Sequence, residues 1–108
     1  MFDKNSVTLL GNLTADPETR DGSKGQYTTF KVATNERWKD GDEWKDKAEF
    51  HSVIAFHERL VTRLGTLKKG ARVLVEAKLK SRKDGETYKI DIVAEDLEVI
   101  TRPEKVAA

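Results

Sequence analysis

Apolar and polar residues alternate along several stretches of the chain, which is the period expected of β-strands with one buried face. The clearest is residues 71–81, where Val73, Val75, Ala77 and Leu79 share one parity. Related patterns, rich in β-branched and aromatic residues, occupy residues 6–13, 26–35, 48–56 and 87–93, and a short final one covers residues 95–100. The chain is therefore expected to be mostly β.

The period becomes helical between the third and fourth of these strands. Leu60, Val61, Leu64 and Leu67 predict an apolar stripe on a helix over residues 58–67. The "KKG" that follows is expected to end it, because cations favour a helix C-terminus and glycine often comes just after it. The order predicts an all-β, five-stranded OB-fold barrel with one short helix between strands 3 and 4.

Extended hairpins are expected to connect these strands. Residues 15–25 have the composition of turns, and residues 36–47 are expected to form a long hairpin loop around Gly41. Asp84-Gly85 predicts a two-residue turn. Centred on that dipeptide, the register places Lys80 opposite Lys89, a like-charge pair that an anion lying across the strands would relieve. Lysines that splay into water are the alternative.

Composition bounds the class of protein. The chain has 108 residues, no cysteine and a net charge of +1. One domain over residues 1–108 is expected, and disulfides, thiolate metal sites and cysteine nucleophiles are excluded. Residues 59–89 hold ten lysines and arginines against three acids, so this segment is +7 and the remainder is −6. This asymmetry favours one positive face, although a solvated surface of mixed charge would have the same count.

The only two tryptophans, Trp38 and Trp44, lie in the most charge-dense segment. An indole there has few apolar neighbours. Stacking on a nucleobase would use its surface without sequence preference. Two other interpretations stay open: the segment folds back onto the barrel, or it docks on a second subunit.

Two phenylalanines share one parity of the third strand. Phe50 and Phe56 lie roughly 20 Å apart at strand rise, so they could hold different bases of one extended strand. The opposite parity contains Val53 and Ala55 and is also apolar. The pattern therefore leaves open whether the phenylalanines belong to the core or to a binding face.

Five blocks of the sequence occur in an order that resembles a known family. They are "VTLLGNLTADPETR", "FKVATNERWKD", "AEFHSVIAFHERL", "LKKGARVLVEAKLKSRK" and "YKIDIVAEDLEVI". Together they resemble the bacterial-type single-stranded DNA-binding proteins over nearly the whole chain. The resemblance implies an OB fold that binds single-stranded DNA with little sequence preference and protects it during replication, recombination or repair.

The resemblance also implies roles for individual residues. Trp38, Phe50 and Phe56 match base-stacking aromatics, and Trp44, which has no clear counterpart, is added as a candidate. His51 matches a histidine at the subunit interface. Charge and resemblance together predict these phosphate-binding residues: Arg20, Arg37, Lys68, Lys69, Lys78, Lys80, Arg82, Lys83 and Lys89. A further tryptophan, common after the "SRK" motif, is missing here.

The expected partners are single-stranded DNA and further copies of the chain, as a homotetramer or a dimer. The family's acidic-tipped tail is not expected in this chain, which is expected to be a tailless or truncated member, so partners recruited through a tail are not expected. A membrane is not expected as a partner either. Location in a bacterial cytoplasm is expected, with a chromosomal, phage or plasmid gene. No cofactor or metal is expected. With His51 and His57 as the only histidines, and no phosphate loop, an enzyme is not expected. The alternative is a primosomal accessory protein that acts through protein contacts.

Overall fold

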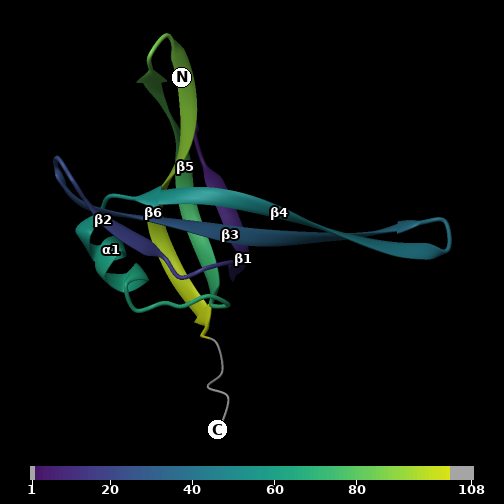
Figure 1. Cartoon of the computed structure of the whole chain (residues 1–108). Coiled ribbons are helices and arrows are strands. Elements are labelled where there is room, and N and C mark those ends of the chain that lie inside the picture. Colours follow the sequence, from purple (N-terminus) through teal and green to yellow (C-terminus); the bar gives the residue numbers. More distant parts are fainter. Residues whose placement is uncertain (1, 103–108) are drawn as a thin grey trace, which may run out of the picture.

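The computed structural model describes residues 2–102, which form six strands and one helix (Figure 1). The strands are β1 (Val7–Leu13), β2 (Glu18–Gly22), β3 (Gly25–Asp40), β4 (Glu43–Ala55), β5 (Arg72–Asp84) and β6 (Thr87–Thr101). The helix, α1 (Glu58–Leu64), lies between β4 and β5. The expectation of an absent tail concerns the C-terminal end and lies outside the described residues.

Five of the strands close into a barrel. The sheet has the order β1-β5-β6-β4-β3-β2, and β1 also pairs with β3. The closing contact joins Asn12 to Ala33 and Leu13 to Val32, while β2 adds to the outer edge of β3. The β4–β6 pairing is parallel. The predicted all-β OB-fold barrel, with its helix between the third and fourth barrel strands, is confirmed.

Alternate residues of the barrel strands form the core, as their period predicts. Val32, Val73 and Val75 have no exposed surface, and Leu60 and Leu64 of α1, each 1% exposed, pack against the same cluster. Burying a valine or leucine side chain contributes about 1.5–3 kcal/mol. The apolar stripe of α1 is therefore a substantial part of what holds the barrel together.

The helix is shorter than the predicted 58–67. It begins after His57, whose Nδ1 accepts a hydrogen bond from the Arg59 N–H at 3.2 Å, and ends at Leu64. At the C-terminus the Thr66 hydroxyl donates to the Arg63 carbonyl at 2.7 Å, a local bond that competes with further helical bonds. Leu67 is still 3% exposed, because the turn that follows returns it to the core. The expectation that "KKG" ends the helix was wrong by one turn.

Two segments expected to be irregular are strands. Residues 18–22 form β2, which makes a hairpin with β3 around a turn ending at Gly25 (φ +115°). The predicted loop over residues 36–47 is instead a two-stranded ribbon. Its strands stay paired as far as Asp40 and Glu43, and Gly41 lies in the turn at φ +66°. In Figure 1 this β3–β4 ribbon twists as it extends far from the barrel. The tryptophans thus have fixed positions on a ladder.

The β5–β6 hairpin has a different register from the predicted one. Asp84 pairs with Thr87, so Gly85 (φ +65°) and Glu86 form the turn. This shift of two residues pairs Lys80 with Asp91, and Lys89 now lies opposite Arg82. The predicted Lys80–Lys89 pair was therefore wrong. β6 is also continuous through residues expected to form two strands, with irregular pairing near Ala77.

Candidate nucleic-acid interface

The outer surface of β4 carries a row of exposed aromatic side chains. Phe50 is 65% exposed and Phe56, just beyond the strand, is 57% exposed, whereas Val53 and Ala55 of the opposite parity are 2% and 0% exposed. The parity left open by the sequence is thereby resolved: the phenylalanines face solvent. Two large rings on a strand, each more than half exposed, are poorly explained by folding alone and offer stacking surfaces.

Trp44 continues this row along β4. It has the same parity as Phe50 and lies six residues away, roughly 20 Å at strand rise. The indole is 58% exposed, and the guanidinium of Arg37 lies 4.9 Å from its ring centroid. Such a cation–π contact contributes about 0.5–1 kcal/mol at an exposed site and holds the ring in place. We call the surface carrying Trp44, Phe50 and Phe56 the aromatic face.

Trp38 lies on the reverse face of the same ladder. It pairs with Lys45, while its neighbour Lys39 pairs with Trp44, so the two indoles alternate across the ribbon. Trp38 is 42% exposed. The structure therefore brings three of the four predicted stacking residues onto one face of the ladder. Trp38 lies almost level with Trp44 along the ribbon but points to the opposite side, because its partner Lys45 has the opposite parity to Trp44.

Two residues of the aromatic face were missed from the sequence. Tyr27 packs against Phe56, with ring centroids 6.1 Å apart and a tilt of 42°. Lys31 pairs with Ser52, between the two phenylalanines, and is exposed. Both could have been found from the strand register, had the tight turn at Gly41 been recognised, because residues whose numbers sum to 83 then pair across β3 and β4.

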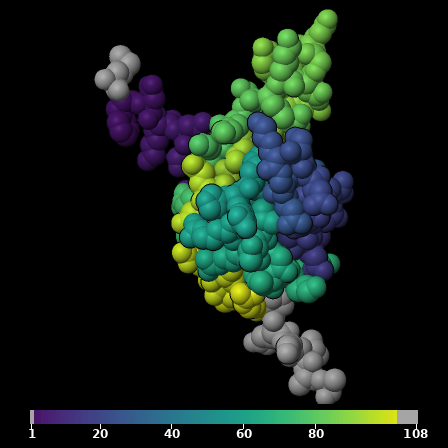
Figure 2. Space-filling view, turned by 90° about the vertical axis from the view of Figure 1, so that its left-hand side faces the viewer, coloured from purple at the N-terminus to yellow at the C-terminus, as the bar shows by residue number. Residues whose placement is uncertain are grey.

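The outer part of the β5–β6 hairpin, residues 78–91, forms a basic arm that stands clear of the barrel (Figure 2). One face carries Lys78, Lys80, Arg82 and Lys89. It continues the outer face of β4, because Val93 pairs with both Lys78 and Ile54. The aromatic face and these four cations therefore lie on the same side of the sheet.

Lys83 lies on the other side of the basic arm. It pairs with Tyr88, which is 70% exposed, and this side also exposes Leu79 and Ile90. The structure does not bring Lys83 together with the other four cations of the arm. An exposed apolar face on a protruding hairpin is a surface that a partner protein could cover.

Most of the nine predicted phosphate-binding residues are ion-paired with carboxylates. Six have such a partner: Arg20 with Glu18, Arg37 with Asp46, Lys68 with Asp16, Lys78 with Glu95, Arg82 with Asp91, and Lys89 with Asp84. Within residues 2–102, Lys69, Lys80 and Lys83 have no ion pair. Exposed ion pairs are worth about 0–1 kcal/mol each, so phosphates can displace these carboxylates.

Four predicted residues lie away from the basic arm, and one of them, Arg37, is on the β3–β4 ribbon. Arg20 pairs with Tyr27 across β2 and β3, which places it next to Phe56. Lys68 and Lys69 lie in the segment between α1 and β5, where the Lys69 N–H donates to Asp16 at 2.7 Å. Arg20 thus lies at an edge of the aromatic face, and Lys68 and Lys69 lie beside Asp16.

His51 points to the inner side of the β3–β4 ladder at the barrel rim. It is partly buried, and its Nε2 forms a 2.9 Å hydrogen bond with the Thr34 hydroxyl. Within residues 2–102 there is no group of three potential metal ligands, and no helix there is long and apolar enough to cross a membrane.

Comparison with known proteins identifies the family. Residues 4–100 match the sequence profile described as "Single-strand binding protein family". The chain belongs to this family. A single-stranded DNA-binding protein of Rhizobium meliloti is 39% identical to this family member over 83 residues, or 73% of the chain. One from Neisseria meningitidis is 35% identical over 103 residues, or 89% of the chain.

Solved structures of single-strand binding proteins share the fold. A Plasmodium falciparum SSB, solved in complex with ssDNA, aligns with a TM-score of 0.76 at 27% identity, covering 94% of this chain and all of that one. A mitochondrial single-stranded DNA binding protein of S. cerevisiae aligns with a TM-score of 0.72 at 16% identity, over 95% of this chain and all of that one. The chain spans 48% of the length of the Rhizobium relative and 59% of the Neisseria relative.

Proposed function

We propose that this protein binds single-stranded DNA with little sequence preference and protects it during replication, recombination or repair. One observation carries the proposal: exposed aromatics at regular spacing share one side of the sheet with a series of cations. Bases would stack on Phe50, Phe56 and Trp44, and Trp38 would take a base on the reverse face of the ribbon. Every base has a π face, which accounts for the lack of sequence preference.

Electrostatic contacts would complete the site. The nine cations named above would neutralise phosphates, with Lys31 as a tenth beside the phenylalanines. The chemistry proposed is binding alone, without an enzymatic reaction, a cofactor or a metal. The proposed ligand is single-stranded DNA of chromosomal, phage or plasmid origin in a bacterial cytoplasm.

Tryptophan fluorescence during titration with oligo-dT tests this function directly. We expect strong quenching by oligo-dT and little by a duplex of the same length, because a duplex hides the base faces. Higher salt should weaken the quenching without abolishing it, since phosphate neutralisation depends on salt and stacking depends on it less. Unchanged fluorescence, together with no complex in a gel-shift assay, would contradict the proposal.

The second candidate is an accessory protein of the primosomal type, which acts mainly by docking on other proteins. The exposed Leu79, Tyr88 and Ile90 on one side of the basic arm favour it, because exposed apolar patches often mark protein contacts. The same titration separates the two candidates, since a protein-docking accessory would leave oligo-dT unbound.

We also propose that the protein self-associates, as a homotetramer or a dimer, with His51 close to a subunit contact. Leu10, 46% exposed on the outside of β1, pairs with Leu74 and offers apolar surface to a second copy. Light scattering after size exclusion is expected to give a mass of two or four times 12.2 kDa. A mass of one chain at micromolar concentration would contradict self-association.

A further inference from the structure

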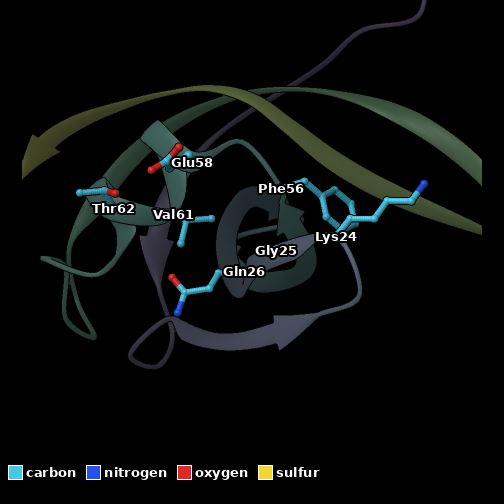
Figure 3. A pocket seen from close by; sticks show the side chains of 7 residues that line it. All are labelled: Lys24, Gly25, Gln26, Phe56, Glu58, Val61 and Thr62. Atoms are coloured by element: carbon cyan, nitrogen blue, oxygen red, sulfur yellow. The ribbon is translucent and has the colours of Figure 1, made fainter.

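A hollow lies beside Phe56, between the β2–β3 turn and α1. It has a volume of about 360 Å³ and is lined by Lys24, Gly25, Gln26, Phe56, Glu58, Val61 and Thr62. Figure 2 shows the β2–β3 hairpin and α1 side by side on one face of the molecule. In the close view, Lys24 and Phe56 lie on one side of the hollow and Glu58 and Thr62 on the other (Figure 3).

The apolar part of the hollow suits a flat ring. Val61, 7% exposed, forms the apolar floor of the hollow, and Phe56, 57% exposed, forms an aromatic wall. The contact with Tyr27 at 6.1 Å supports Phe56 from the β3 side. At Gly25 a Cβ would meet nothing within 4 Å, so the turn is open to a ligand on that side.

Among the described residues, the polar side chains Lys24, Gln26 and Glu58 around the hollow have few partners. Among residues 2–102, Lys24 and Glu58 form no ion pair, although nine other ion pairs are present. Gln26 has only a long 3.5 Å hydrogen bond to Asp21. A ligand that offers an acceptor to Lys24 and donors to Glu58 and Gln26 would satisfy all three.

The unpaired carboxylate indicates which ligand is suitable. An acid next to a DNA path repels phosphates, so Glu58 would weaken binding unless it accepts a hydrogen bond from the ligand. Cytosine and adenine carry an exocyclic amine that donates such a bond, and glutamine and carboxylate side chains are matched to these amines. Thymine has a carbonyl oxygen, O4, at the position of the cytosine amine, and a carboxylate repels that oxygen.

We propose that this hollow binds one nucleotide of the DNA strand and selects at that position for a base with an exocyclic amine. The base lies against Phe56 and Val61, the amine donates to Glu58 and Gln26, and Lys24 contacts the phosphate. The proposal rests on the proposed function and refines it: one position of the strand is read, while the remaining positions are bound by stacking alone.

The test compares oligo-dC with oligo-dT of equal length, using tryptophan fluorescence on the whole chain. For the double variant Gln26→Ala/Glu58→Ala, we expect the ratio of the affinity for oligo-dC to the affinity for oligo-dT to fall about fivefold from the wild-type ratio. The ratio of the two affinities is the readout, because loss of a negative charge raises affinity for every strand alike. Both side chains are exposed, so the barrel is expected to fold unchanged.

Glu98→Ala is the matched control, because Glu98 is an exposed carboxylate of β6 that does not line the hollow. It should leave the ratio of the two affinities unchanged. Glu58→Ala alone is a second variant and should shift the ratio in the same direction as the double variant, because Glu58 is one of the two proposed acceptors of the amine. If the double variant changes both affinities equally, or neither, the inference is wrong while DNA binding stands. If the wild-type chain binds neither oligonucleotide, the proposed function itself fails.

Discussion

Replacing Phe50 and Phe56 together by alanine is expected to weaken binding of oligo-dT at least about 30-fold. Each base–aromatic stack is worth roughly 1–3 kcal/mol, so two lost stacks cost at least about 2 kcal/mol. Both rings are more than half exposed, and removing them leaves the core intact. Fluorescence titration remains usable, because Trp38 and Trp44 are unchanged.

Phe2→Ala is a suitable control for the loss of an exposed phenylalanine. Phe2 is 89% exposed and lies ahead of β1, outside the β3 and β4 strands that carry the aromatic face. Its replacement should leave both affinity and thermal stability unchanged. Binding by the Phe50/Phe56 double variant within threefold of wild type would contradict the role of the aromatic face, and would shift attention to the basic arm.

Gly11→Ala is expected to destabilise the barrel by about 3 kcal/mol, at the upper end of overpacking costs. At Gly11 β1 pairs with β5, and at the next residue it also closes onto β3. A Cβ there would clash with the carbonyl oxygen of Ala33 and lie 2.9 Å from Val32 Cγ1. A backbone oxygen cannot move aside like a flexible side chain, so the closing contact between β1 and β3 must open.

The measurement is the free energy of unfolding in urea, compared at equal protein concentration because self-association would contribute to it. Gly65→Ala is the control, since Gly65 has helical φ and ψ angles and its nearest atom to an added Cβ is at 3.3 Å. That variant should lie within about 1 kcal/mol of wild type. Equal stabilities of the two variants would show that β1 and β3 tolerate separation.

The barrel could be predicted from the sequence because its strands have one buried face. Alternation along residues 71–81 places Val73 and Val75 in the core, where both are fully buried. The orientation of β4 could not be predicted, because both of its faces are apolar. A face that offers rings to a ligand has the same composition as a face that packs in a core, and only the closed barrel separates Phe50 from Val53.

The β3–β4 ribbon was missed for the opposite reason. Beyond the barrel both of its faces are in water, so neither selects apolar residues and no period of two appears in the segment around Trp38 and Trp44. The register predicted for β5–β6 was wrong because Asp84-Gly85 is only one of the possible two-residue turns in this segment. The observed turn at Gly85 and Glu86 instead allows Lys89 to contact Asp84 at 2.9 Å and Arg82 to contact Asp91 at 2.7 Å.

The ion pairs that cover six of the nine predicted phosphate contacts make the protein its own competitor for DNA. At these six cations a phosphate must displace a carboxylate, and that carboxylate remains nearby on the same protein. When the phosphate dissociates, the carboxylate can therefore pair with the cation again immediately. Nine free cations would give a logarithmic salt slope of about −6, and the three unpaired lysines alone about −2. A measured slope near the smaller value, together with rapid exchange between strands, is the result expected if these carboxylates compete with phosphates for the cations.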